Sequence, residues 1–191
     1  MVEGEDGLVS ISGGKLTTYR RMAQDVMDRI DARQGHRLGH PTTRMQLYGS
    51  GGWFDTRAAF LRRAGELSLG MGIAEHLSQA YGTAADELLN LISSRPEHGV
   101  RLIPELPYIE AEVVYACQAE LALTIEDVLA RRTHVALQEP SRGTAIAPRV
   151  AELMAKELGW SKEEQSRQLL EFRSFALEQA GPLGLPERNE A

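Results

Sequence analysis

Helical spacing is the pattern that most restricts the fold of this chain of 191 residues, because its apolar residues recur mostly every three or four positions. From Phe54 onward one amphipathic segment follows another, and Thr83, Thr124 and Ser161 stand where capping residues are expected at helix starts. We therefore predict a mainly α fold of about six to eight helices. The predicted helices cover residues 15–33, 54–67, 73–80, 83–92, 110–121, 124–133, 148–159 and 161–176.

Residues 7–12, GLVSIS, are the one convincing strand, and we expect it to have no partner strand within this chain. An unpaired strand suggests that this stretch belongs to a larger sheet. The helix predicted after it carries an apolar stripe that includes Leu16 and Tyr19, so we expect Tyr19 in the core. We also expect Met45, Leu47 and Trp53 to dock on the core.

Composition excludes some classes of function. The formal net charge of −6 argues against nucleic acid as a partner, because phosphate binding needs concentrated Lys and Arg. Cys117 is the only cysteine, so no internal disulfide can form, which is typical of a reducing compartment. No apolar run approaches the roughly 20 residues of a membrane-spanning helix, and we expect a cytoplasmic protein. Peripheral membrane contact stays open.

The junction between the strand and the first helix, Gly13-Gly14-Lys15, is the best candidate site. Unpaired N–H groups and the dipole at a helix N-terminus favour an anion, and glycines allow close approach to the backbone. Lys15 adds a positive charge, and Thr17 and Thr18 add hydroxyl groups. An equally simple interpretation is that the glycines turn the chain, the lysine is solvated and the threonines cap the helix.

Nucleotide-binding loops are missing. The sequence has neither GxxxxGK[ST] nor GxGxxG, and GSGGWF at 49–54 lacks the third glycine of the second pattern. Alone, the chain should not bind a dinucleotide tightly, although it can supply one wall of a site.

The other polar candidates favour structural roles. The five histidines show no metal-ligand spacing, Ser12 and Ser141 lack a nucleophile elbow, and Cys117 has apolar neighbours. Arg131 and Arg132 are interpreted first as forming a buried salt bridge with Asp127, Glu126 or Glu120, and second as a contact for another domain or for acidic headgroups. The histidines are His36, His40, His76, His98 and His134.

Four stretches in order resemble one family. SGGKLTTYRRMAQDVMD (12–28), YGTAADELLNL (81–91), EAEVVYACQAELALTIEDVLARRTHVAL (110–137) and VAELMAKELGW (150–160) are similar to segments of the aerobic, FAD-dependent glycerol-3-phosphate dehydrogenases, in their C-terminal part. Several ordered matches are more specific than any one of them. The upstream flavin-binding part of such enzymes has no counterpart in this sequence.

The resemblance implies a helical C-terminal cap domain with a strand left over from the flavin-domain sheet. Residues 1–14 would end the FAD and substrate domain, 15–180 would form the helical domain and 181–191 a flexible tail. The junction would lie beside the flavin, with backbone groups stabilising negative charge on the reduced ring. The cofactor-binding residues would then be Gly13, Gly14, Lys15, Leu16, Thr17 and Thr18, with Lys15 also near the substrate. No catalytic residue and no metal ligand is expected.

The implied activity is oxidation of glycerol 3-phosphate to dihydroxyacetone phosphate, with electrons passing through FAD to quinone. The implied partners are the protein's own N-terminal FAD domain, the substrate and the quinone, at the inner face of the cell membrane; a homodimer stays open. The chain alone should be inactive. The alternatives are a glycerophosphate oxidase of the same superfamily, which reduces oxygen, and a helical interaction module without chemistry.

Overall fold

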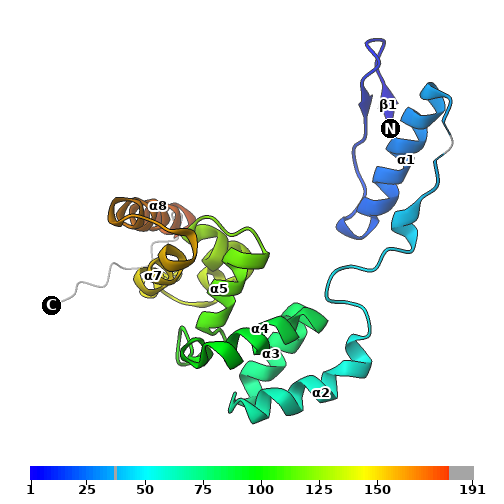
Figure 1. Ribbon diagram of the computed structural model, residues 1–191. Coiled ribbons are helices and arrows are strands. Elements are labelled where there is room, and N and C mark those ends of the chain that lie inside the picture. The colour runs from blue at the N-terminus through cyan, green and yellow to red at the C-terminus, as the bar shows by residue number, and fades with distance from the viewer. Residues whose placement is uncertain (37, 181–191) are drawn as a thin grey trace. The chain divides into compact units, whose positions relative to one another are not determined.

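The chain separates into two compact units, one formed by residues 1–47 and one that begins at Tyr48. The computed structural model describes residues 1–36 and 38–180, and Figure 1 colours the first unit in blues and the second from cyan to orange. The predicted tail, 181–191, lies outside the described residues. The proposed boundary between 14 and 15 stays a prediction.

A short hairpin opens the first unit. Strand β1 (Val2–Glu3) pairs antiparallel with β2 (Val9–Ser10), with Val2 opposite Ser10. The expectation that the strand has no partner in this chain is wrong. The reason is the turn between the strands, where the Asp6 carboxylate accepts the N–H of Leu8 at 3.0 Å, a local bond that favours chain reversal.

Helix α1 (Tyr19–Gln34) follows a 3₁₀ turn (Leu16–Thr18) and ends at Gly35, whose φ of 70° is the left-handed C-terminal conformation. Polar contacts attach it to the hairpin. Arg29 Nε donates to the Glu3 carboxylate at 2.6 Å, and Arg33 donates to the carbonyl of Gly7, also at 2.6 Å. This unit is therefore joined largely through exposed arginines.

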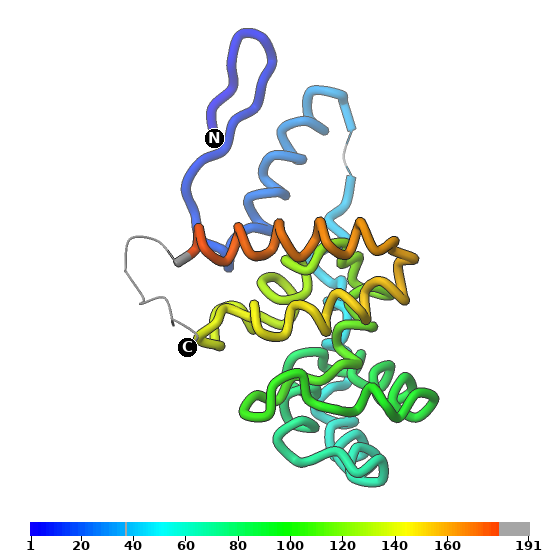
Figure 2. Tube along the Cα trace, turned by 90° about the vertical axis from the view of Figure 1, so that its left-hand side faces the viewer, coloured from blue at the N-terminus to red at the C-terminus, as the bar shows by residue number. Residues whose placement is uncertain are grey.

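In the described part of the second unit, every regular element is a helix. The prediction of a mainly α fold is confirmed. Figure 2 shows α7 turning back sharply into α8, so that the two helices run side by side. The helices of this unit are α2 (Trp53–Glu66), α3 (Met71–Tyr81), α4 (Ala85–Ser94), α5 (Glu110–Ala119), α6 (Val135–Gln138), α7 (Ala147–Leu158) and α8 (Lys162–Ala180).

Helix α5 is the centre of the second unit. Every residue from 110 to 116 is buried, as expected for a helix surrounded by other elements. Val113 and Ala116 join a cluster formed with α7 and α8, whereas Ala111 and Tyr115 join a second cluster formed with α2, α3 and α4. One short helix thus links two apolar cores.

Two of the three predicted capping residues are confirmed by their hydrogen bonds. The carboxylate of Asp127 accepts the N–H of Thr124 at 3.0 Å, and the hydroxyl of Thr124 accepts the N–H of Asp127 at 3.1 Å. Ser161 Oγ accepts the N–H of Glu164 at 3.2 Å. The predicted cap at Thr83 is wrong, because Thr83 lies inside a 3₁₀ turn (Gly82–Ala84) that precedes α4.

Three expected core contacts have different outcomes. Trp53 does dock, since its indole N–H donates to the carbonyl of Ser78 at 2.8 Å. Met45 and Leu47 are 67% and 68% exposed, so their predicted docking is wrong. Tyr19 is 59% exposed and is not a core residue.

Within residues 1–36 and 38–180, none of the helices combines the length and the apolar character that crossing a membrane requires.

Candidate functional site

The glycine pair before α1 adopts a backbone conformation that other residues rarely take. Gly13 and Gly14 both have φ of 90°, in the positive region that favours glycine. A Cβ atom added to Gly13 would meet nothing within 4 Å, whereas one added to Gly14 would lie 2.5 Å from Sδ of Met22. The junction is therefore open at Gly13 and is closed on one side at Gly14 by a flexible side chain.

Thr18 fixes the turn that follows. Its hydroxyl accepts the N–H of Lys15 at 3.0 Å and donates to the carbonyl of Lys15 at 2.8 Å. The N–H of Thr18 also donates to that carbonyl, at 2.9 Å. Thr18 is thus a cap for the turn, which is the simpler of the two roles that its position allowed.

Two backbone donors remain at the tip. Within the described part of the chain, the N–H groups of Leu16 and Thr17 have no protein acceptor, as usual for the first residues of a helical turn. Leu16 is 89% exposed, and Gly13, Gly14 and Lys15 are exposed as well. The tip can therefore present N–H groups to a group outside the first unit.

Lys15 is the cation at this tip. No carboxylate lies within 4.0 Å of its ammonium group among residues 1–36 and 38–180. By contrast Arg21 pairs with Asp25 at 2.9 Å, and His40 lies 3.2 Å from Asp28. A positive charge without an internal counterion is a feature that an anion or polarised carbonyl could use.

A hollow of about 410 Å³ is lined in part by the two glycines, and Lys15 is not among its lining residues. Both of its ionisable side chains are carboxylates, those of Asp25 and Asp28. The hollow is lined by Met1, Ile11, Ser12, Gly13, Gly14, Met22, Asp25 and Asp28.

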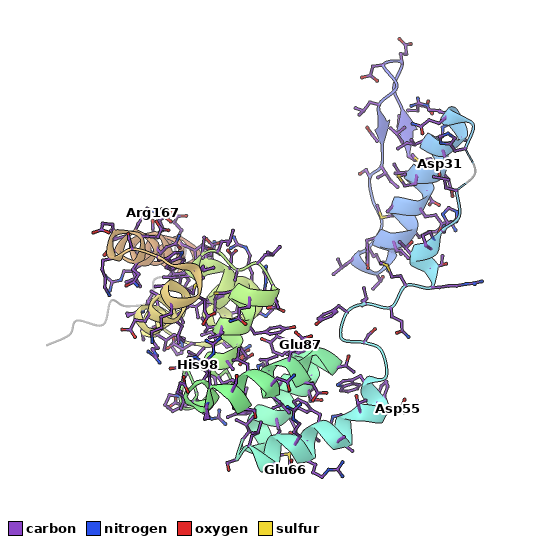
Figure 3. All side chains as sticks on the ribbon, in the orientation of Figure 1. Asp31, Asp55, Glu66, Glu87, His98 and Arg167 are labelled. Carbon is purple, nitrogen blue, oxygen red and sulfur yellow. The ribbon has the colours of Figure 1, made fainter. Side chains whose placement is uncertain are left out.

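The first unit has no apolar core of its own. Among its described residues, the single buried one is Asp31, labelled in Figure 3, and the buried hydrophobic residues all belong to the second unit. Its apolar side chains instead lie at the surface, with Leu16 and Val2 among the most accessible. Such a surface is typical of a segment that packs against further polypeptide.

Arg131 and Arg132 pair with carboxylates or carbonyls, as first interpreted, but not in a buried salt bridge. Arg131 donates to Asp127 at 2.9 Å and also pairs with Glu126. Arg132 donates to the carbonyl of Glu120 at 2.7 Å. Arg131 is half exposed, so its ion pairs lie at the surface rather than in the interior.

Cys117 is a poor nucleophile. Burial, with a smaller contribution from Glu157, raises the pKa of its thiol to about 11. At neutral pH the thiolate is therefore rare, which agrees with a packing role.

Two buried carboxylates of α5 are the polar groups that sequence reasoning missed. Glu110 accepts hydrogen bonds from Arg149 Nε at 2.7 Å and Nη2 at 2.9 Å, and its carboxylate lies 3.3 Å from Nδ1 of His98. Figure 3 labels His98 near the end of α4. Burial raises the pKa of Glu110, but the bonds from Arg149 and His98 outweigh it, and the net pKa lies below its ordinary value.

Glu112 is the more deeply buried of the two. It accepts the N–H of Ile109 at 2.8 Å and the hydroxyl of Tyr81 at 3.0 Å, and it lies 2.8 Å from Nε2 of His76. Glutamates in the first turn of a predicted helix were a signal for capping. Their partners on α3 and α7 are distant in sequence, so no local pattern could identify them.

No group of three or more His, Cys, Asp or Glu side chains in residues 1–36 and 38–180 is arranged to hold a metal ion. His36 and His134 lie at the surface, whereas His76 and His98 contact the buried glutamates.

The fold and the junction define a class: a helical domain that follows a short strand and an exposed glycine–lysine tip. A model of the family "C-terminal domain of alpha-glycerophosphate oxidase" matches residues 40–165, about two thirds of the chain. The chain belongs to this family, which confirms the resemblance noted in the sequence.

Named relatives are longer proteins. The chain is 35% identical over 181 residues to the mitochondrial glycerol-3-phosphate dehydrogenase of Homo sapiens, a match that covers 93% of this chain and 25% of that protein. It is 30% identical over 174 residues to the glycerol-3-phosphate dehydrogenase of Synechocystis, covering 91% of this chain and 31% of that protein. The chain thus spans about a quarter to a third of these relatives.

One solved structure has the same fold. The glycerol-3-phosphate dehydrogenase from Bacillus halodurans, solved as a complex with FAD, superposes with a TM-score of 0.75 and 24% sequence identity. The match covers 97% of this chain and 38% of that chain.

Proposed function

We propose that this chain is the helical C-terminal domain of a flavin-dependent dehydrogenase that oxidises glycerol 3-phosphate to dihydroxyacetone phosphate, with FAD as cofactor and quinone as electron acceptor. Family membership supports the proposal, and so do the named dehydrogenase relatives. The observation that carries it is the exposed Gly13-Gly14-Lys15 tip, with two free N–H groups and a cation without an internal counterion.

The residues of the tip suit a flavin in kind. The site would take a planar, polar ring: Gly13 leaves room beside the backbone, and the N–H groups of Leu16 and Thr17 are available as donors. FAD, when bound, would accept the two electrons removed from the substrate alcohol. The tip would stabilise the resulting negative charge, as donors in an oxyanion hole do.

The remaining residues would hold that arrangement. Gly14 allows the positive φ that turns the chain, and Thr18 locks the turn through Lys15. Lys15 would contact either the flavin carbonyl or the phosphate of the substrate. No residue of this chain transfers a proton in the proposal, so the chain alone is expected to be inactive.

The first unit would contact the FAD domain of the same protein, because it exposes its apolar side chains and buries no hydrophobic residue in the part of it that the structure describes. A membrane quinone as acceptor would bring the whole enzyme to the inner face of the cell membrane. The proposal is compatible with a homodimer of the whole enzyme.

Reconstitution tests the proposal. FAD is titrated into the chain alone and into the chain mixed with the flavin-binding domain of its own polypeptide. The expected result is flavin absorbance and glycerol 3-phosphate-dependent dye reduction in the mixture only. A mixture that binds FAD but never oxidises glycerol 3-phosphate would contradict the activity and favour a helical module without chemistry.

Lys15→Met in the polypeptide that contains both domains tests the site. We expect turnover to fall, or the Michaelis constant for glycerol 3-phosphate to rise, by at least about tenfold. Arg21→Met is the matched control, since Arg21 lies nearby in the first turn of α1, is exposed and pairs with Asp25. Unchanged values in Lys15→Met would remove Lys15 from the site.

The family name favours one alternative, a glycerophosphate oxidase that reduces oxygen to hydrogen peroxide. Peroxide release in air, equal in amount to substrate oxidised and unaffected by added quinone, would support the oxidase. Quinone-dependent turnover without peroxide would support the dehydrogenase.

A further inference from the structure

Lysine is rare in this chain, and two of the three lysines line the same hollow. The chain uses arginine for 18 of its 21 cationic side chains; its lysines are Lys15, Lys156 and Lys162. The last two lie near the turn from α7 into α8, which Figure 2 shows. They line a hollow of about 430 Å³. The hollow is lined by Glu152, Ala155, Lys156, Trp160, Lys162 and Gln165.

The polar groups of this hollow are mostly donors. Among the described residues, no carboxylate lies within 4.0 Å of the ammonium group of Lys156 or Lys162, and Lys162 has only a long contact of 3.4 Å to Gln165 Oε1. In the same part of the chain, neither the indole N–H of Trp160 nor the amide NH₂ of Gln165 has a protein acceptor. Four donor groups therefore face solvent around one hollow.

The single carboxylate in the lining is already neutralised. Glu152 accepts a hydrogen bond from Arg149 at 2.9 Å. On the first turn of α8, outside the lining, Glu164 pairs with Arg167, and the Glu163 carboxylate is held by its own N–H and the Ser161 hydroxyl. Within the lining, the two lysines are the charges that have no ion-pair partner.

Helix dipoles explain one of these lysines but not the other. Lys156 lies in the last turn of α7, where a cation is favoured. Lys162 begins α8, where the partial positive charge of the helix disfavours a cation. An anion bound between them would relieve this repulsion.

We propose that this hollow binds a small soluble phosphate monoester, with its dianionic phosphate between Lys156 and Lys162 and its apolar part against Trp160. Two ammonium groups suit a dianion, and the indole offers both a flat apolar face and an N–H donor. The volume lies within the usual range for small-molecule sites. This site belongs to the second unit and does not depend on the function proposed for the Lys15 tip.

Binding of phenyl phosphate to the 191-residue chain tests the proposal by calorimetry and by emission of Trp160 in a Trp53→Phe background. We expect saturation with a Kd of roughly 1 mM or tighter, weakened by salt. The double variant Lys156→Gln/Lys162→Gln should bind at least about tenfold more weakly, and Lys15→Gln, which removes the third lysine, should bind as the wild type does. Circular dichroism checks that each variant is folded.

Three results with soluble ligands would overturn the proposal. They are a lack of saturation by phenyl phosphate below about 10 mM, an unchanged Kd in the folded double variant, and equally tight binding of benzoate, which carries one charge. Vesicles of phosphatidylcholine with phosphatidic acid test the lipid source of the same phosphate chemistry. Lysine-dependent vesicle binding without phenyl phosphate binding would also overturn it, because the ligand would then be a headgroup.

Discussion

Glu112 lies 2.8 Å from His76, carboxylate oxygen to Nε2, and this contact ties α5 to α3 in the interior of the second unit. Glu112 is 1% exposed and also accepts the N–H of Ile109 and the hydroxyl of Tyr81. Burying a carboxylate costs little free energy of folding while all three of its partners are present. Removing the carboxylate alone costs much more, because its partners are then left without an acceptor.

Glu112→Ala should therefore lower the free energy of unfolding by about 3 kcal/mol, because the buried N–H of Ile109 and the partly buried side chains of His76 and Tyr81 lose their partner. Urea denaturation followed by circular dichroism measures the change. Glu97→Ala is the control: Glu97 is exposed and should change stability by less than about 0.5 kcal/mol. Equal effects of the two substitutions would show that the Glu112 contacts do not stabilise the fold.

Arg149→Met should destabilise the chain in a pH-dependent way. Burial raises the pKa of Glu110, but bonds from Arg149 and His98 bring the net value below the ordinary 4.5. A carboxylate whose pKa is lowered on folding contributes stability above its unfolded pKa, and this contribution is lost as the pH falls through the folded pKa. At pH 7 we expect a loss of about 3 kcal/mol in the variant, since Glu110 is left buried without its guanidinium partner and keeps only the contact with His98.

The difference between wild type and Arg149→Met should then shrink as the pH is lowered below 4.5, where Glu110 becomes protonated. Denaturation series between neutral and acid pH measure it. Glu152→Gln removes only the exposed partner of Arg149 and should cost less than about 1 kcal/mol. A difference that stays constant with pH would contradict the assignment to Glu110.

Gly82→Ala should be much more harmful than Gly159→Ala. Both glycines have positive φ, 58° and 69°, but only Gly159, with ψ of 34°, lies in the left-handed helical region, where alanine costs about 1–2 kcal/mol. Gly82 has ψ of −131°, a conformation outside that region that is largely restricted to glycine. At Gly82 the new Cβ would also lie 2.0 Å from the carbonyl oxygen of Gly49, which accepts the N–H of Thr83 at 2.8 Å. At Gly159 nothing lies within 4 Å.

We expect Gly82→Ala to cost about 1–3 kcal/mol more than Gly159→Ala, because the backbone at Gly82 and Gly49 must move to accept the new Cβ atom. Thermal unfolding of the two variants gives the comparison. Similar melting temperatures would mean that the backbone at Gly49 and Gly82 can move apart at little cost in free energy.

Cys117 should react slowly with thiol reagents in the native chain. Burial and Glu157 raise the pKa of its thiol to about 11, so thiolate is scarce at pH 8. Ellman's reagent should label it much faster in urea than in buffer. Labelling in buffer as fast as in urea would show that the α5 surface around Cys117 is open.

Helix α1 should exchange its amide hydrogens faster than α5. The buried hydrophobic residues within residues 1–36 and 38–180 all belong to the second unit, whereas α5 is buried over residues 110–116. Hydrogen exchange with mass spectrometry compares the two helices within one sample. If α1 were as protected as α5 in the chain alone, the first unit would not need further polypeptide to be stable.

Local sequence signals determined the helices and most of their ends. Apolar spacing, the reciprocal Thr124–Asp127 cap, Ser161 and the glycine at 159 act within a few residues, so their outcome can be read without the fold. The glycine–lysine junction was also visible, because positive φ and a helix start are local properties.

Only the tertiary structure decided what is buried and which charges meet. The stripe of α1 predicted a core position for Tyr19, yet Tyr19 is 59% exposed, since a periodic pattern shows that a face is apolar but not what packs on it. Glu110 and Glu112 meet partners that are distant in sequence. Lys156 and Lys162 line one hollow because the chain turns back between α7 and α8. Burial and pairing depend on the sum of all neighbours, and no short stretch of sequence contains that sum.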